Sequence, residues 1–232
     1  MTHGRTTLVL LPGLDGTGDL FEPLLSRLDP SIEPVVVRYP LAEPLGYEAL
    51  TSIARRALPT VGPYLILGES FSGPIAVQLA AEPPGDFRGL ILCASFVSSP
   101  MPHLQPFEWL LGVGPVRLLA RWLAPLTLLG RFQTRELRAL LLRTVSRLPR
   151  SVLVTRIRNV LAANSIAAFV RVRVPTMYLQ ATEDTLLPPS CVEEVRRLAP
   201  KVRVVKIEAP HCVLQCAPDE AARAIRDFVR SV

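Results

Sequence analysis

One serine of this sequence lies in a turn whose composition could make it a nucleophile. Ser70 stands in GESFSG, residues 68–73, between an apolar run and a segment of helical period. In a sharp strand-to-helix turn of this kind, small residues two before and two after the serine leave room for the two elements, and the serine is held in a strained conformation. The same residues also fit a plain turn whose serine caps the helix. A base and an acid elsewhere in the chain would favour chemistry.

A serine hydroxyl attacks a carbonyl when an imidazole removes its proton, and the imidazole needs a carboxylate that fixes its tautomer. Of the three histidines, His3 is terminal and His103 opens a helical region, whereas His211 follows the last expected strand in IEAPHCVLQCAPDE. Asp184 follows the fifth expected strand in ATEDTLLP and is the preferred acid, with Glu183 as its competitor. The chain order is therefore serine, acid, histidine, which is the order of one particular fold.

A glycine-rich stretch after the first expected strand could stabilise the negative charge that acyl transfer places on a carbonyl oxygen. Two backbone N–H donors fixed in advance are needed there. Phe71, the residue after the serine, is expected to supply one, and Leu14 the other, from LLPGLDGTGDLF. We call residues 12–18 the glycine loop. A phosphate-binding role is disfavoured, because the loop fits neither the dinucleotide pattern nor a P-loop.

The elements that must position these residues alternate along the chain in the manner of a parallel sheet with crossover helices. The expected strands are 6–11, 34–39, 64–68, 89–95, 176–181 and 202–207, and the expected helices lie near 19–28, 46–58, 71–82, 190–198 and 218–230. Ligands of such sheets bind at the carboxyl ends of the strands. The serine, the acid and the histidine all follow strands, so they are expected at one edge.

The alternation stops between residues 100 and 173, where stretches such as VRLLARWLAPLTLL have apolar residues at helical spacing and no convincing strand. We predict an all-helical cap there, inserted into one core domain formed by residues 1–99 and 174–232. Most apolar residues of the cap are expected to be buried against one another and the sheet. Four are candidates for lining an acyl pocket: Trp109, Leu110, Trp122 and Leu126.

The positive charge of the chain is concentrated in this cap. Residues 101–173 contain twelve arginines and only two acidic residues, a net charge of +10, whereas the remainder carries −4. Most of these arginines are interpreted as a solvated face whose stems cover apolar surface. An acidic carrier protein, an anionic lipid surface or an acidic substrate are the alternatives. Nucleic acid is disfavoured, because no nucleic-acid-binding motif accompanies the arginines.

Composition also limits the compartment and the cofactors. The apolar run at the N-terminus is too short for a signal peptide and ends in PGLDG, and no uncharged apolar run reaches the roughly 18 residues of a membrane span. A cytoplasmic protein with no transmembrane segment and four reduced cysteines is therefore expected. Cys212 and Cys216 flank the stretch after His211, but two thiols and one imidazole make a weak metal site. No metal and no cofactor are expected.

Over nearly its whole length the sequence resembles the α/β-hydrolase superfamily. The resemblance rests on PGLDG as the oxyanion loop, GESFSG as the nucleophile turn, ATEDTLLP as the acid turn and APHCVLQCAPDE as the histidine loop, all in order. The cap is similar to that of small bacterial carboxylesterases, including the type that demethylates pimeloyl-carrier-protein esters. Ser72 stands where the family usually has a second glycine, and Pro12-Gly13 replaces the common His-Gly.

This resemblance implies an α/β-hydrolase fold with a mostly parallel sheet of about six strands, no leading antiparallel hairpin and an all-helical cap. It implies a serine carboxylesterase that forms an acyl-enzyme, with short to medium acyl chains and a small-molecule ester as substrate. An acyl thioesterase, an acyltransferase or a carrier-linked ester hydrolase would use the same residues. A receptor that binds a small ligand without turning it over is the alternative from another class.

Overall fold

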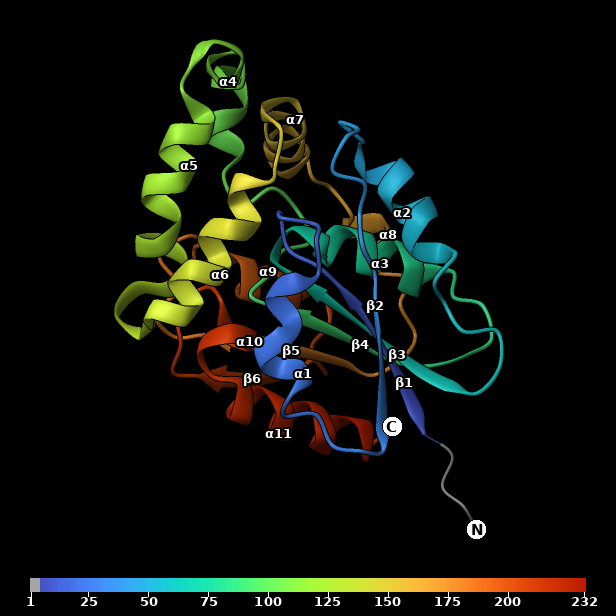
Figure 1. The fold of residues 1–232 in the computed structure, drawn as a ribbon. Helices are drawn as coiled ribbons and strands as arrows, with labels where there is room; N and C mark the ends of the chain where they lie inside the picture. The colour runs from blue at the N-terminus through green and yellow to red at the C-terminus, as the bar shows by residue number, and fades with distance from the viewer. Residues whose placement is uncertain (1–4) are drawn as a thin grey trace.

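The computed structural model describes residues 5–232 and contains one six-stranded parallel sheet between two layers of helices (Figure 1). The strand order is β2-β1-β3-β4-β5-β6, and every neighbouring pair is parallel. The strands are β1 (Thr6–Leu11), β2 (Ile32–Val36), β3 (Pro63–Glu69), β4 (Asp86–Cys93), β5 (Thr176–Ala181) and β6 (Arg203–Ile207). The predicted parallel sheet of about six strands is confirmed.

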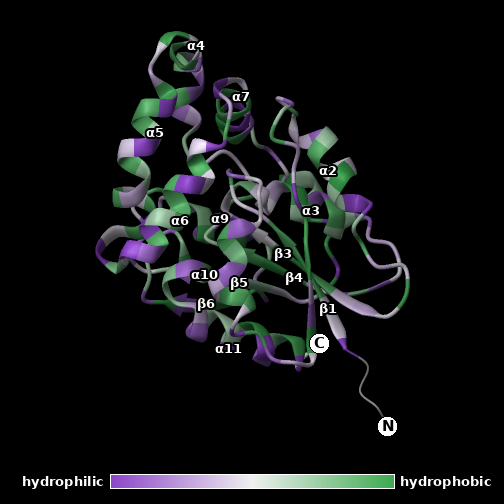
Figure 2. Cartoon of the chain, in the orientation of Figure 1, coloured by the Kyte–Doolittle hydropathy of each residue, from purple (hydrophilic) through white to green (hydrophobic). Residues whose placement is uncertain are grey.

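The central strands read as continuous apolar runs because both faces of the sheet are covered. Side chains alternate between the faces: Val9 and Leu11 pack in one buried cluster, and Leu8 and Leu10 pack in the other. The first face is covered by α2 (Tyr47–Arg55), α3 (Gly73–Ala81) and α9 (Ser190–Leu198). The second is covered by α1 (Glu22–Leu25), α10 (Val213–Cys216) and α11 (Pro218–Val229). Figure 2 shows the hydrophobic strands inside these layers.

Several element boundaries differ from the prediction: the strand expected at 89–95 is Asp86–Cys93, and the helix expected near 46–58 is Tyr47–Arg55. Two further differences have a reason in the backbone. β2 begins at Ile32 and not at Pro34, because β2 is an edge strand and an edge strand tolerates proline inside it. The helix expected near 19–28 is a 3-10 turn, η1 (Asp19–Phe21), followed by the single turn of α1. Pro23 lacks an N–H and therefore fits the first turn of a new helix better than the middle of a long one.

Residues 100–173 contain helices and no strand of the sheet. They are η3 (Pro102–Phe107), α4 (Leu110–Val113), α5 (Val116–Ala124), η4 (Pro125–Leu129), η5 (Gly130–Phe132), α6 (Arg135–Ser146), α7 (Arg150–Leu161) and α8 (Ile166–Phe169). The last, α8, packs beside α3 on the sheet, whereas α4 to α7 stand over the carboxyl ends of the strands (Figure 1). The limits of the cap stay a prediction.

The cap contacts the two loops that matter most for the site. Val116 and Val152 pack in a buried cluster that includes Leu14 of the glycine loop. Leu129 and Leu141 pack in another cluster. That second cluster includes Cys212, the neighbour of His211. In the described part of the chain, no helix combines the length and the apolar character that crossing a bilayer requires.

Candidate active site

The turn that carries Ser70 is strained and tightly enclosed. β3 ends at Glu69, and Ser70 has φ 46°, a left-handed conformation that residues other than glycine rarely adopt. A 3-10 turn, η2 (Ser70–Ser72), then leads into α3. A Cβ added to Gly68 would lie 2.7 Å from the Cβ of Ala76, and one added to Gly73 would lie 1.9 Å from the Oγ of Ser95. Strand and helix therefore approach too closely there for side chains.

The structure brings the three predicted residues together in one hydrogen-bonded chain. The His211 Nε2 lies 2.7 Å from the Ser70 Oγ, and its Nδ1 lies 2.8 Å from the Asp184 Oδ2. Asp184 follows β5 and His211 follows β6, so both loops leave the same edge of the sheet as β3. The predicted competitor, Glu183, points elsewhere and binds Arg131, with 2.9 Å between the Nε and Oε2 atoms.

The environment of Asp184 fixes the tautomer of His211. Burial by itself would raise the pKa of the Asp184 carboxyl, but the hydrogen bond from His211 and those from the amides of Leu187 and Leu186 outweigh it and leave the pKa below its usual value. A charged carboxylate can only accept, so Nδ1 carries the proton and donates it. Nε2 is then free to accept from the hydroxyl of Ser70, which is the polarity that removal of the serine proton requires.

A hydrogen bond from Ser72 joins the turn that carries Ser70 to the glycine loop. The Ser72 hydroxyl donates to the carbonyl of Pro12 and is 2.9 Å from the hydroxyl of Tyr39. Serine in place of the usual glycine thus ties the turn to the loop that faces it. Leu14 lies in this loop and Phe71 in η2, next to the serine. Their roles as N–H donors stay predictions.

Sequence reasoning missed a buried carboxyl directly before Ser70. Glu69 accepts a hydrogen bond of 2.9 Å from the Nε2 of Gln215, which also donates to the carbonyl of Leu20. Burial raises the pKa of Glu69 to about 7, although the bond from Gln215 and the amide of Gly13 act against it. The pKa of Asp15, which is equally buried, is raised for the same reason. One buried acidic group, Asp15, therefore belongs to the glycine loop, and a second, Glu69, lies against Gly13 of the loop.

Sequence reasoning also missed a buried arginine of the cap, which donates hydrogen bonds to the backbone of the glycine loop. Arg156 of α7 is 1% exposed, and its guanidinium donates to the carbonyls of Leu14 (2.8 Å), Asp15 (2.7 Å) and Pro40 (3.0 Å). A Cβ added to Gly16 would lie 2.4 Å from its Nη1. Arg156 falls four residues after the buried Val152, on the apolar face of the helix, and this position was the available signal.

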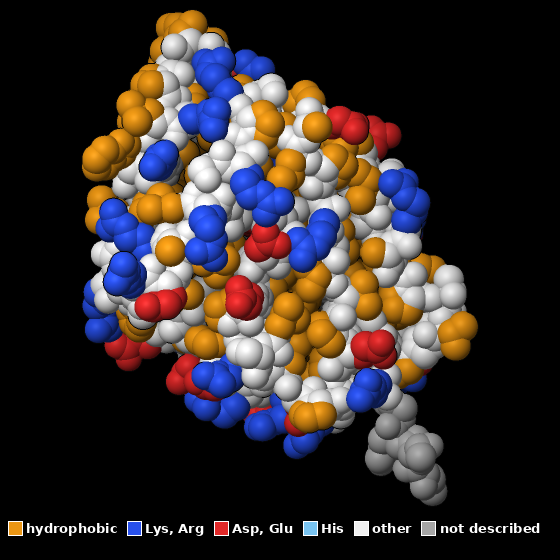
Figure 3. Space-filling model, in the orientation of Figure 1, with side chains coloured by type: hydrophobic (Ala, Val, Ile, Leu, Met, Phe, Trp, Pro, Cys, Tyr) orange, Lys and Arg blue, Asp and Glu red, His pale blue; other side chains and the backbone are white. Residues whose placement is uncertain are grey.

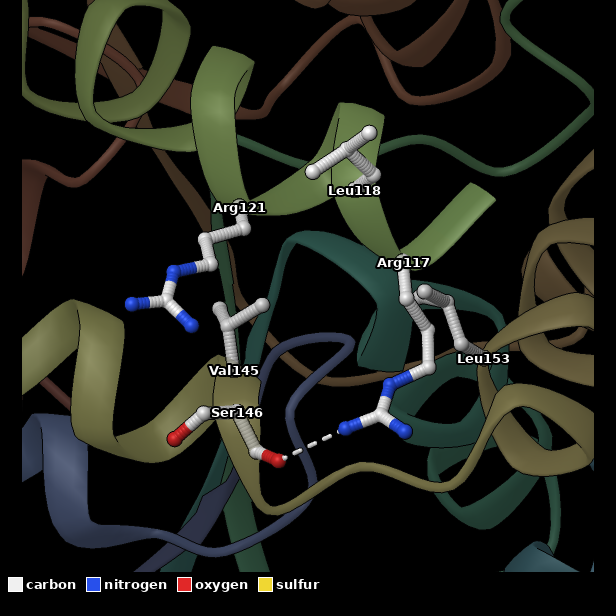
Figure 4. Close-up of a pocket in the computed structure, with 6 residues that line it drawn as sticks. All are labelled: Arg117, Leu118, Arg121, Val145, Ser146 and Leu153. Carbon is white, nitrogen blue, oxygen red and sulfur yellow. Dashed lines mark hydrogen bonds between the residues drawn. The ribbon is translucent and has the colours of Figure 1, made fainter. Parts of the chain in front are cut away.

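The four residues predicted to line an acyl pocket lie on the outer surface of the cap. The exposed fractions are 60% for Trp109, 46% for Leu110, 70% for Trp122 and 64% for Leu126. Two cavities lie at the cap, and neither is lined by Ser70 or by any of these four residues. One, of about 270 Å³, lies between α5, α6 and α7 (Figure 4). The other, of about 450 Å³, lies where α6 meets η1. The pocket assignment stays a prediction.

The four cysteines are free, and residues 5–232 contain no group of three or more His, Cys, Asp or Glu side chains that could hold a metal ion.

A sequence profile described as the Alpha/beta hydrolase family matches residues 8–224. The chain belongs to the alpha/beta hydrolase family.

Solved structures agree with this membership in fold. The enol-lactonase of Burkholderia xenovorans LB400 superimposes with a TM-score of 0.81 at 17% identity, covering 99% of this chain and 94% of the lactonase. A hydrolase from Oleispira antarctica gives 0.83 at 14% identity, and an esterase from Exiguobacterium antarcticum gives 0.82 at 13%. Each of these covers 98% of this chain and 92% of the other. None of the curated proteins matches this chain.

The first prediction for this alpha/beta hydrolase concerns Arg156. Arg156→Met leaves three carbonyls without a donor and Asp15 without its nearby cation, so we expect a loss of about 3 kcal/mol or more in the free energy of unfolding. The amide of Gly16 donates to the carbonyl of Gly13 within the loop, and the amide of Tyr39 donates to the carbonyl of Gly16. Both amide hydrogens should exchange faster with deuterium in the variant. Arg158→Met, an exposed position on the same helix, is the control. Equal stability and exchange in the two variants would show that Arg156 does not hold the loop.

The second prediction concerns the pH dependence of stability. The pKa of Glu69 is about 7 in the folded hydrolase and about 4.5 in an unfolded chain, so the folded state binds this proton more tightly. The contribution of Glu69 to stability is therefore complete below about pH 4.5 and is lost as the pH rises to about 7. Glu69→Gln removes this loss and keeps an acceptor for Gln215. At pH 8 the variant should be more stable than the wild type, by up to about 3 kcal/mol.

Urea unfolding at pH 5 and pH 8 measures this difference. Glu43→Gln, which changes an exposed glutamate, is the control and should leave the pH dependence as it is in the wild type. If Glu69→Gln changed stability equally at both pH values, the carboxyl would not be protonated in the folded state.

Proposed function

We propose that this alpha/beta hydrolase is a serine carboxylesterase. The single observation that carries the proposal is the hydrogen-bonded chain from the Ser70 hydroxyl through His211 to the Asp184 carboxylate. Membership of the family and the similarity in fold to a lactonase and an esterase support it. Both of those names refer to enzymes that act on an ester bond, and a small-molecule ester is the corresponding substrate class.

In the proposed reaction the Ser70 Oγ forms a bond to the ester carbonyl carbon while its proton passes to Nε2 of His211. Asp184 stabilises the resulting imidazolium, as its short bond to Nδ1 allows. The N–H groups of Leu14 and Phe71 are proposed to bind the carbonyl oxygen as it becomes negatively charged. The imidazolium then protonates the leaving alkoxide, and the carbon–oxygen bond of the ester breaks.

Hydrolysis of the acyl-enzyme repeats these steps with water. His211 accepts a proton from water, the hydroxide attacks the acyl carbon, and the Ser70 Oγ leaves as it recovers its proton. The products are a carboxylic acid and an alcohol. The similarity of the cap to that of small esterases favours short to medium acyl chains, and a series of p-nitrophenyl esters of increasing acyl length tests this preference.

The third prediction is the loss of ester hydrolysis in Ser70→Ala. Without the hydroxyl no acyl-enzyme forms, so kcat for p-nitrophenyl butyrate should fall by about a thousandfold or more. Ser52→Ala, which removes an exposed hydroxyl from α2, is the matched control and should retain wild-type turnover. Residual activity of Ser70→Ala within tenfold of the control would overturn the assignment. Tight ligand retention with negligible wild-type turnover would favour a receptor.

A further inference from the structure

The outer surface of the cap exposes an unusual amount of apolar side chain. Of the twelve large hydrophobic side chains that are exposed among residues 5–232, ten lie between residues 104 and 126. We call six of them the apolar cap face: Trp109, Leu110, Leu119, Trp122, Leu123 and Leu126. Figure 3 shows hydrophobic side chains along the edge of the molecule that Figure 1 assigns to α4 and α5. A large patch of exposed apolar surface on a folded protein typically marks a site that binds another protein or a membrane.

Helix α5 shows that this exposure is built into the sequence. An amphipathic helix normally turns its large apolar residues inward. In α5 the inward row contains Val116 and Ala124, which are buried, whereas Leu119, Trp122 and Leu123 point outward and are 51%, 70% and 50% exposed. The small residues make the contact with the rest of the cap. The large ones stay exposed.

A groove lined by two arginines lies beside α5, the helix that carries part of this face. Arg117 and Arg121 lie four residues apart on α5 and line the cavity of about 270 Å³ together with Ser146 and residues of α6 and α7 (Figure 4). Arg117 donates to the carbonyl of Ser146 at 3.2 Å, and Arg121 has neither an ion pair nor a hydrogen bond with any described residue. Residues 101–173 carry a net charge of +10. Arg117 and Arg121 therefore give this groove a positive charge that attracts anions.

Apolar residues beside arginines restrict what can cover this surface. A second copy of the chain joined about a two-fold axis would bring the same positively charged cap against itself, and like charges at close range repel. An anionic lipid bilayer matches both features. Leucine side chains enter the acyl boundary, tryptophan rings lie at the level of the headgroups, and arginines bind lipid phosphates.

We propose that the apolar cap face docks on the surface of a membrane containing anionic lipid, with Arg117 and Arg121 binding headgroup phosphates. The proposal goes beyond ester hydrolysis and does not depend on it. Docking would bring the cap against the bilayer with the chain lying on the surface and not spanning it. A second copy of the chain is the other occupant that the test distinguishes.

The two tryptophans of the chain, Trp109 and Trp122, both lie on this face, so the intrinsic fluorescence of the unmodified protein reports on it directly. Titration with vesicles of phosphatidylcholine containing about one third phosphatidylglycerol should shift the emission to the blue. Brominated acyl chains should quench it. The protein should bind pure phosphatidylcholine vesicles at least about tenfold more weakly than the anionic vesicles. Added salt should weaken its binding to the anionic vesicles.

Charge variants test the basic groove. Each arginine near an anionic surface contributes about a fivefold increase in partitioning, so Arg117→Gln with Arg121→Gln should weaken vesicle binding about 25-fold. The control, Arg56→Gln with Arg203→Gln, removes the same charge from exposed positions of the core and should change binding by no more than about twofold. Leu119→Gln with Leu123→Gln, which keeps both tryptophans, should also weaken binding. Circular dichroism confirms that each variant is folded.

Three results would overturn the proposal. The first is an unchanged emission spectrum with anionic vesicles, and the second is equal binding by the two pairs of arginine variants. The third is a dimer in sedimentation velocity whose tryptophans are already shielded without lipid. Ser70→Ala should bind vesicles as the wild type does, so a failure of the esterase proposal and a failure of membrane docking give different results.

Discussion

The structure depends on one imidazole that must reach a hydroxyl and a carboxylate carried by different loops. His211 meets both, at 2.7 Å and 2.8 Å, although its partners lie 141 and 27 residues away in the chain. A parallel sheet solves this problem because all its strands end at one edge, and β3, β5 and β6 each deliver one residue there. The strained backbone of Ser70 lies in the same place, where β3 and α3 approach so closely that Gly68 has no room for a side chain.

Three buried ionisable side chains lie near this same edge of the sheet. Asp15 of the glycine loop and Glu69, which contacts the loop at Gly13, are buried with raised pKa values, and Arg156 of the cap donates hydrogen bonds to the backbone of the same loop. Burying such groups is costly unless they are bonded. Here the cost is offset by hydrogen bonds that fix the loop, and because one of the partners belongs to α7, the position of the cap and the shape of the glycine loop are mechanically linked.

Much of this could be predicted from sequence, for reasons that particular residues illustrate. Ser70, Asp184 and His211 each follow an apolar run that marks a strand, so their meeting at one edge follows from the fold. Arg156 could not be found in the same way, because helical period shows which face a residue occupies but not which loop it meets. The cap residues show a similar limit: whether Trp122 lies inward or outward depends on α5 packing through its small residues, and periodicity alone favours the opposite.

The central claim is that the hydrogen-bonded chain makes one serine hydroxyl nucleophilic, and covalent labelling measures this most directly. A p-nitrophenyl phosphate triester transfers its phosphoryl group to an activated serine and releases p-nitrophenolate, so each labelled chain can be counted by mass and the site located by peptide mapping. We expect one label per chain, on Ser70, and no labelling of His211→Ala under the same conditions. Labelling at another residue, or equal labelling of the histidine variant, would contradict the claim.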